Sequence, residues 1–166
     1  MGLIAFIRGA GEKLFGKEVK AAETDAAVQA DPARVAEANR AAATAIENHL
    51  AGFSFPVTAL TVTFDVATGT ARVYGVAQDQ ATREKVVLAA GNVEGVMQVD
   101  DQMSVQVNST PPAQYYTVVS GDNLSKISKQ YYGNPNLYNK IFEANQPMLK
   151  HPDKIYPGQV LRIPPQ

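Results

Sequence analysis

The chain has 166 residues, of which 45% are hydrophobic, so it can form one ordinary domain or two small ones. Its formal net charge of −1 gives no electrostatic footprint for nucleic acid, and no apolar run approaches the roughly 18 residues that cross a membrane. The absence of cysteine excludes disulfides and thiolate metal sites, and the two distant histidines, His49 and His151, disfavour a histidine-rich metal site or a Ser/His/Asp hydrolase.

The first segment, residues 2–15, predicts a short amphipathic helix that docks on a core. Apolar residues recur in it at helical spacing, at Leu3, Phe6, Ile7, Ala10 and Leu14. A membrane-surface helix is the alternative, but the segment is short and has few basic residues. These basic residues follow the apolar run instead of preceding it, which is the wrong order for a signal peptide. We therefore expect a cytoplasmic protein.

Residues 16–31 are alanine-rich and charged, and we assign them with the first segment to an N-terminal region and connector, 1–31. Asp31 followed by Pro32 is typical of a helix start, with a capping side chain before a proline in the first turn. The next apolar face predicts a helix to Gly52, through Val35, Asn39, Ala42, Ile46 and Leu50. His49 lies at its end and is interpreted as a surface residue.

Two alternating stretches, residues 60–66 and 71–77, predict strands joined by a turn. Gly75 within the second strand indicates the close approach of another backbone. Asp79 is placed to cap a helix that runs to Ala90, with Gly91 as its terminating left-handed glycine. A third strand is predicted over 97–107, followed by a proline-containing linker, 108–114.

The last fifty residues predict a compact strand–helix–helix–strand unit. Tyr116–Val119 is a short apolar strand, and Asp122 is placed to cap the helix that follows it. Gly133 fits the left-handed end of that helix, and Asn134-Pro135 repeats the helix-start pattern. Val160–Ile163 is the closing strand and is expected to pair with the first.

This unit resembles a LysM domain from end to end, over Tyr116–Pro164. The resemblance rests on YTVVSGDNLSKISKQYYG and KIYPGQVLRIP. LysM domains bind peptidoglycan and chitin, which implies a shallow glycan groove between two turns. By position the groove consists of Ser120, Gly121, Asp122, Asn123 and Leu124 facing Ile155, Tyr156 and Pro157. The alternative interpretation is that the glycine, aspartate and proline residues only form the turns.

The preceding unit, residues 32–107, resembles a BON domain in the run VTFDVATGTARVYGVAQDQATREKVVLAAGNVEGVMQVDDQMSV. The predicted fold class is therefore α+β. It comprises two small domains, an αββαβ BON domain at 32–107 and a βααβ LysM domain at 115–166, together with the N-terminal docking helix.

The chain as a whole resembles the bacterial BON–LysM potassium-binding proteins. The resemblance rests on the initial MGL, AGEKLF, GNVEGV, VDDQ and YNKIFEANQPMLKHPDKIYPGQVLRIP. It implies a cytoplasmic sensor or buffer that binds potassium ion selectively and becomes more compact. The implied ligands are backbone carbonyls of the N-terminal segment and of the GNVEGV loop, namely Ile7, Ala10, Gly91, Val93 and Val96.

The chemistry of these two segments is consistent with that implication. Neutral carbonyls can replace the water shell of potassium, whereas carboxylates favour calcium or magnesium. Both segments are poor in acids, and both are expected near helix C-termini, where carbonyls lack intrahelical partners and the dipole is negative. A calcium site that uses Glu94, Asp100 and Asp101 is the minor alternative.

Three functions are thus weighed. A potassium sensor or buffer is favoured over a glycan-binding protein that uses the LysM groove, because no signal peptide is recognised. The third is an adaptor whose BON domain contacts membranes or proteins. An enzyme is the least expected class, since no nucleophile–base pair is visible. The expected partners are potassium ion and, through the LysM unit, a peptidoglycan fragment or a protein, and the chain is expected to be a monomer.

Overall fold

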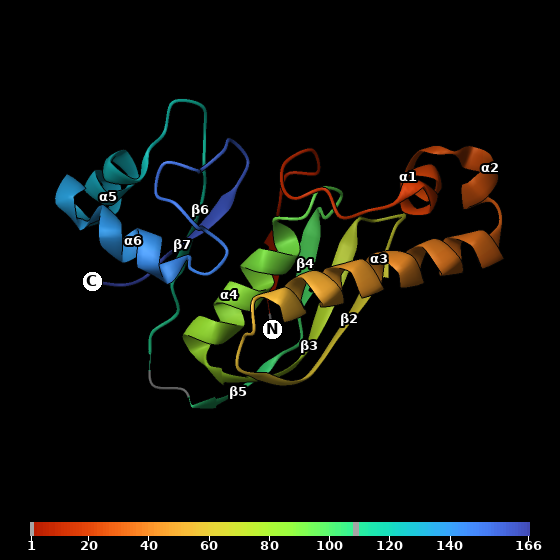
Figure 1. The fold of residues 1–166 in the computed structure, drawn as a ribbon, viewed down its shortest axis with the longest axis horizontal. Coiled ribbons are helices and arrows are strands. Elements are labelled where there is room, and N and C mark those ends of the chain that lie inside the picture. Colours follow the sequence, from red (N-terminus) through yellow and green to blue (C-terminus); the bar gives the residue numbers. More distant parts are fainter. Residues whose placement is uncertain (1, 108–109) are drawn as a thin grey trace.

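The protein, seen here in a computed structural model that describes residues 2–107 and 110–166, contains a larger sheet-based unit and a smaller C-terminal one (Figure 1). The larger unit contains a mixed sheet in the order β1-β4-β3-β2, with β5 beside β3. Its elements are β1 (Gly2–Ala5), α1 (Lys17–Thr24), α2 (Ala26–Gln29), α3 (Pro32–Gly52), β2 (Val57–Asp65), β3 (Thr70–Asp79), α4 (Gln80–Gly91), β4 (Gln98–Asp101) and β5 (Ser104–Val107).

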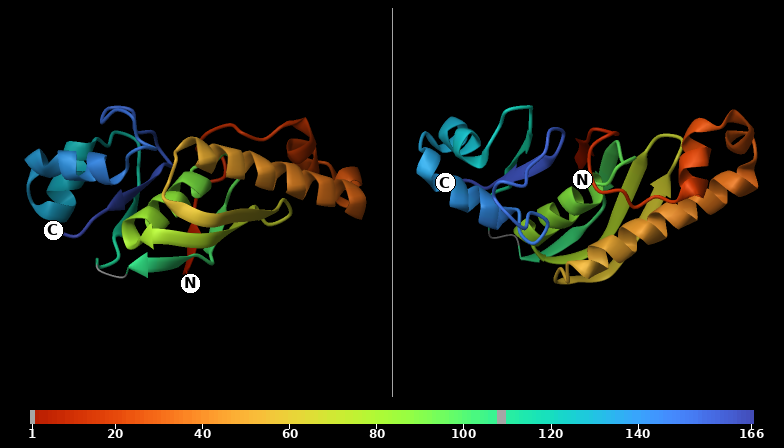
Figure 2. Two further views of the ribbon diagram at one scale, coloured as in Figure 1. Left: turned by 60° about the horizontal axis from the view of Figure 1, so that its bottom comes forward. Right: turned by 45° about the horizontal axis from the view of Figure 1, so that its top comes forward.

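Helices α3 and α4 cover one face of this sheet (Figure 2). The burial of β3 alternates accordingly, because Ala71 and Val73 are buried while Arg72 and Tyr74 are exposed. Strands β2 and β3 form an antiparallel hairpin, and α4 carries the chain over to β4, which is parallel to β3. The helix–strand–strand–helix–strand order matches the prediction, and the α+β class is confirmed.

The predicted strand over 97–107 is divided in two. The side chain of Asp101, at the end of β4, turns back and accepts a hydrogen bond from the Met103 amide at 3.0 Å. That bend separates β4 from β5, and both remain parallel to β3.

Gly75 lies where another backbone approaches closely, as predicted. Its φ is +145°, and a Cβ there would lie 3.2 Å from the Thr58 carbonyl oxygen. The register of β2 against β3 shifts between Thr58 and Thr61, and Ala59 has a positive φ of 53°. The glycine therefore accommodates a bulge in the neighbouring strand.

The predicted helix starts are confirmed in the larger unit. Asp31 caps α3 by accepting hydrogen bonds from the Ala33 and Arg34 amides, and Asp79 caps α4 through the Thr82 amide at 2.7 Å. The connector before α3 forms two short helices, α1 and α2. Val19 and Ala22 of α1 are buried in the core.

The predicted N-terminal helix is wrong. Residues 2–5 form β1, an edge strand paired antiparallel to β4, and the Phe6 amide donates to the Met97 carbonyl at 2.8 Å. Phe6 is buried, while Leu3 and Ile7 are 63% and 50% exposed. The apolar side chains of this segment therefore do not form the single buried face that a docked helix would need. The sheet edge supplies backbone partners to a segment whose glycines favour no helix.

The C-terminal unit has the predicted strand–helix–helix–strand order. Its elements are β6 (Gln114–Thr117), α5 (Leu124–Tyr132), the 3₁₀ helix η1 (Pro135–Leu137), α6 (Tyr138–Ala144) and β7 (Val160–Ile163). Strands β6 and β7 pair antiparallel. Gly133 ends α5 with φ +70°, and Asn134 caps η1, both as predicted.

The predicted cap of α5 is displaced by one residue. Asn123, not Asp122, accepts from the Lys126 amide at 2.9 Å. Asp122 instead accepts from the Tyr116 hydroxyl at 2.7 Å and from the Val119 amide at 3.0 Å. It thus fixes the turn between β6 and α5.

Buried polar groups join the two units along β7. The Asn92 side-chain amide donates to the Val160 carbonyl at 2.9 Å, and its Oδ1 accepts from the Val160 amide at 2.8 Å. Arg162 Nε lies 2.6 Å from Glu84 Oε2, and these side chains are 7% and 3% exposed. These contacts tie α4 and its C-cap residue Asn92 to the C-terminal unit. The predicted domain boundaries stay a prediction. Among the described residues, no helix has the length and apolar character that a bilayer crossing requires.

Candidate functional site

The N-terminal segment and the loop after α4 lie side by side, as the resemblance implies. The Gly95 amide donates to the Arg8 carbonyl at 2.9 Å, and the Glu12 amide donates to the Asn92 carbonyl at 2.9 Å. The Glu94 amide donates to the Glu12 carbonyl at 2.8 Å. Three backbone hydrogen bonds therefore align two stretches that are some eighty residues apart in the chain.

Two glycines allow this close approach. Gly11 has φ +122°, and a Cβ there would overlap the carbonyl oxygen of Asn92. Gly95 has φ +101°, and a Cβ there would lie 2.8 Å from the Phe15 ring. A side chain at either position would be strained in its backbone and would separate packed groups.

Gly91 has a different role from the predicted one. It is the last residue of α4 and is not left-handed, and the cap residue is Asn92. A Cβ on Gly91 would overlap the ring of Phe6. The glycine is therefore needed for packing, which a prediction based on helix ends did not anticipate.

The five predicted carbonyls belong to these two segments. The Ile7 oxygen accepts from the Ala10 amide at 3.0 Å, and the Val93 oxygen accepts from the Val96 amide at 3.1 Å. Among the described residues, no hydrogen bond ends on the carbonyl oxygens of the other three, Ala10, Gly91 and Val96. Ile7 and Ala10 form a turn and not a helix end, so the expected dipole is absent on that side.

The glutamates near this loop face cations. Glu94 lies 3.9 Å from both Lys13 and Lys20 and is partly exposed. Glu23 Oε1 is buried against Gly95 and has no hydrogen-bond partner among the described residues. Burial raises the pKa of Glu23, and the positive charges of Arg8 and Lys20 oppose this shift.

The calcium alternative is contradicted. Asp100 pairs with Arg72 at 3.0 Å and Asp101 pairs with Arg83 at 2.7 Å, so neither carboxylate is free to join Glu94. In the described part of the chain, no group of three or more His, Cys, Asp or Glu residues could hold a metal ion.

A turn of the C-terminal unit adds a third segment. Gly158 has φ +89°, and a Cβ there would lie 2.5 Å from the Ala10 Cβ and 3.5 Å from Ile7 Cδ1. The turn thus rests directly on the two N-terminal residues that the resemblance assigns to the ion.

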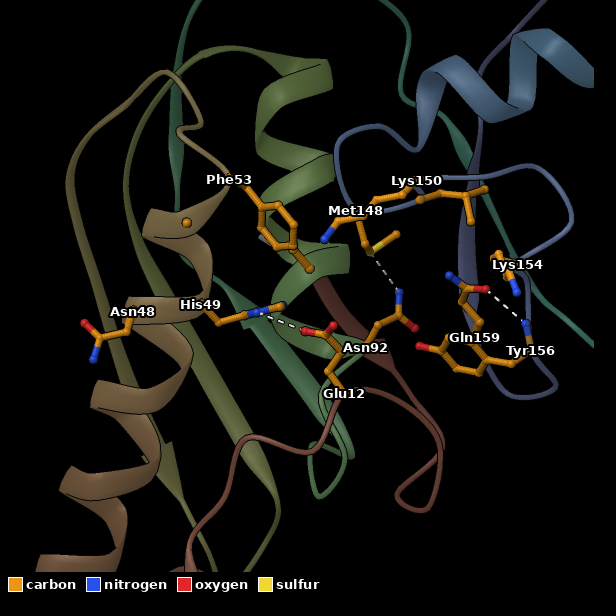
Figure 3. Close-up of a pocket in the computed structure, with 13 residues that line it drawn as sticks. Glu12, Asn48, His49, Phe53, Asn92, Met148, Lys150, Lys154, Tyr156 and Gln159 are labelled. Carbon is orange, nitrogen blue, oxygen red and sulfur yellow. Dashed lines mark hydrogen bonds and ion pairs between the residues drawn. The ribbon is translucent and has the colours of Figure 1, made fainter.

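Between the two units lies a cleft of about 540 Å³ (Figure 3). His49 and Phe53 from the end of α3 face Met148, Tyr156 and Gln159 of the C-terminal unit across it. The prediction of a surface His49 is wrong, because its side chain is only 13% exposed and lies 3.2 Å from Glu12. Its ring packs edge-on against Phe53.

The burial of His49 makes stability depend on pH. Burial lowers the pKa of His49 below its usual value of 6.5, and Lys150 acts in the same direction, while Glu12 opposes the shift. Burial prevails because Glu12 is 64% exposed and screened by solvent. Below about pH 6.5 the unfolded chain binds the proton more readily than the folded chain. Stability therefore falls as pH drops from there towards the lowered pKa of the folded state, and then levels off.

We therefore expect His49→Gln to reduce the loss of melting temperature between about pH 7.5 and pH 5. The measurement is thermal unfolding of both proteins at the two pH values. Equal losses would contradict the assigned role of burial.

The residues of the predicted glycan groove are only partly brought together. Asn123 and Leu124 line a shallow hollow with Tyr138, Pro152 and Asp153. Ser120, Gly121 and Pro157 are exposed, Ile155 packs against the local core, and Asp122 is engaged in its turn. Tyr156 lines the large cleft instead.

Comparison with known proteins shows the family of the chain. The LysM domain family matches residues 116–164. Over 164 residues the chain is 47% identical to the potassium binding protein Kbp of Escherichia coli O6:H1, covering 99% of both proteins. The chain belongs to the Kbp family. An uncharacterized protein of Deinococcus radiodurans is 53% identical over 49 residues, which are 30% of this chain and 19% of that protein.

Membership of the Kbp family and the LysM match confirm the corresponding predictions from sequence. The BON assignment of residues 32–107 and the ligand set stay predictions. The sequence did not reveal the cleft, because its lining residues come from five separate stretches between Glu12 and Gln159.

Proposed function

We propose that this protein binds potassium ion selectively through backbone carbonyl oxygens and acts as a cytoplasmic sensor or buffer, not as an enzyme. The observation that carries the proposal is the 47% identity, over 99% of both chains, to a protein named for potassium binding. The proposed ligands are the carbonyls of Ile7, Ala10, Gly91, Val93 and Val96.

The local chemistry supports a large monovalent cation. Three of the five carbonyl oxygens accept no hydrogen bond from the described residues, and each of the other two keeps a second lone pair. Gly91, Val93 and Val96 are buried, so an ion there would exchange its water shell for neutral oxygens. The nearby carboxylate of Glu94 faces two lysines, which makes the site less favourable for divalent cations.

The packing also supports compaction on binding. Ile7 and Ala10 touch Gly158 of the LysM unit, and they neighbour the loop that carries Gly91, Val93 and Val96. An ion held by both segments would fix the surface on which the LysM turn rests. Binding would therefore favour the docked arrangement of the two units over more open ones.

Potassium chloride is expected to raise the melting temperature well above sodium chloride at equal ionic strength. A ligand that binds only the folded state adds about 2.7 kcal/mol at a hundredfold excess over its Kd. The measurement is thermal unfolding of the full chain in each salt. Glu94→Gln is the control, and it should retain the difference, because its carboxylate is not a proposed ligand. Identical melting curves in the two salts would refute selective binding, and loss of the difference in Glu94→Gln would indicate carboxylate ligation.

A further inference from the structure

We propose that the cleft between the two units is a binding site for a small organic anion, one that carries a carboxylate or phosphate group on an apolar body. This proposal does not rest on potassium binding, because it concerns different atoms. The volume of about 540 Å³ is in the range of small-molecule sites.

The polar groups that face the cleft without a partner are donors. Lys150 and Lys154 lie at its rim, and neither has an ion-pair partner among the described residues. Among the described residues that line the cleft, the only acidic one is Glu12, which pairs with His49. An anionic group that enters the cleft at this rim therefore meets an excess of positive charge.

Gln159 and Tyr156 supply neutral donors deeper in the cleft. Gln159 is 3% exposed, and its Oε1 accepts from the Tyr156 amide at 3.2 Å. Its Nε2, on the other side of the amide in Figure 3, donates to no described residue. The Tyr156 hydroxyl likewise has no described partner, and burial raises its pKa to about 12, so it stays protonated. Both donors match an acceptor-rich ligand.

Apolar side chains line the cleft on both sides. Phe53 and Ala89 belong to the larger unit, and Met148 belongs to the C-terminal unit. A ligand with an aromatic or aliphatic body can rest between these side chains while its anionic group reaches the lysines. The combination of an apolar lining with four donors selects an amphipathic anion over a free inorganic ion.

The test is a titration of the full chain, labelled at its methionine methyl groups, with 2-naphthoate and with 2-naphthyl phosphate. Met148 is the methionine that lines the cleft, and Met97 and Met103 serve as internal references. We expect a saturable shift of the Met148 methyl signal with at least one anion. Neutral 2-naphthamide should bind at least about tenfold more weakly, because it lacks the charge.

Variants assign the binding to the lysines. Lys150→Gln combined with Lys154→Gln should weaken binding of the anion at least about tenfold. The matched control, Lys17→Gln with Lys129→Gln, changes two exposed lysines outside the cleft and should leave binding within about twofold. The proposal is overturned if neither anion shifts Met148, if 2-naphthamide binds equally well, or if both double variants behave alike.

Discussion

Gly11→Ala is expected to weaken potassium binding by roughly tenfold to hundredfold. The added Cβ would overlap the Asn92 carbonyl oxygen, and φ at this position is +122°. Forcing a side chain into such a position costs about 1–3 kcal/mol, and every 1.4 kcal/mol is about tenfold in affinity. The substitution separates the two segments that carry the proposed ligands but leaves β1 and Phe6 in place. The measurement is a potassium titration of the variant and the parent chain.

Gly9→Ala is the matched control, two residues away in the same segment. A Cβ at this position would have nothing within 4 Å, and the backbone there is not left-handed. The variant should bind potassium within about twofold of the parent chain. If the two alanine variants bind equally well, the contact between Gly11 and Asn92 does not support the ion site.

Arg162→Met is expected to lower the free energy of unfolding by about 3–5 kcal/mol, because it leaves the buried Glu84 carboxylate without its cation. The two side chains are 7% and 3% exposed, with a separation of 2.6 Å. Glu84 would keep its hydrogen bonds from Gln80 and the Ala113 amide, which do not neutralise it. Denaturant unfolding of the two proteins measures the difference.

Arg72→Met provides the comparison at an exposed ion pair, on strand β3 of the larger sheet. Arg72 pairs with Asp100 at 3.0 Å, but its side chain is 57% exposed. Its removal should cost less than about 1 kcal/mol, since solvent screens the pair. Similar losses in the two methionine variants would show that the Glu84–Arg162 pair does not hold the units together.

The sequence was most informative where local chemistry decides the structure. Asp31, Asp79 and Gly133 were assigned correctly because a cap or a left-handed glycine depends on a few neighbouring atoms. Gly75 was likewise recognised, because a glycine inside a strand often marks a bulge or the close approach of another backbone.

The sequence was least informative where a distant segment decides. Residues 2–15 have apolar residues at helical spacing, yet β4 offers them a sheet edge, and Phe6 fills the space above Gly91. The His49 side chain is largely but not fully buried, because the C-terminal unit lies across the cleft from the end of α3. The local sequence around residues 2–15 or around His49 does not show that these distant segments pack there. The adjacency of the two segments that carry the proposed ligands was implied by family resemblance, not by periodicity.

The most direct measurement of selective potassium binding is isothermal titration of the metal-stripped full chain with potassium, sodium and calcium chlorides. We expect saturable binding of about one potassium ion, with sodium at least about tenfold weaker and calcium no stronger than sodium, because neutral carbonyls suit a large, weakly hydrated ion. Equal heats for potassium and sodium, or saturable binding of calcium alone, would contradict selective binding of potassium by carbonyls.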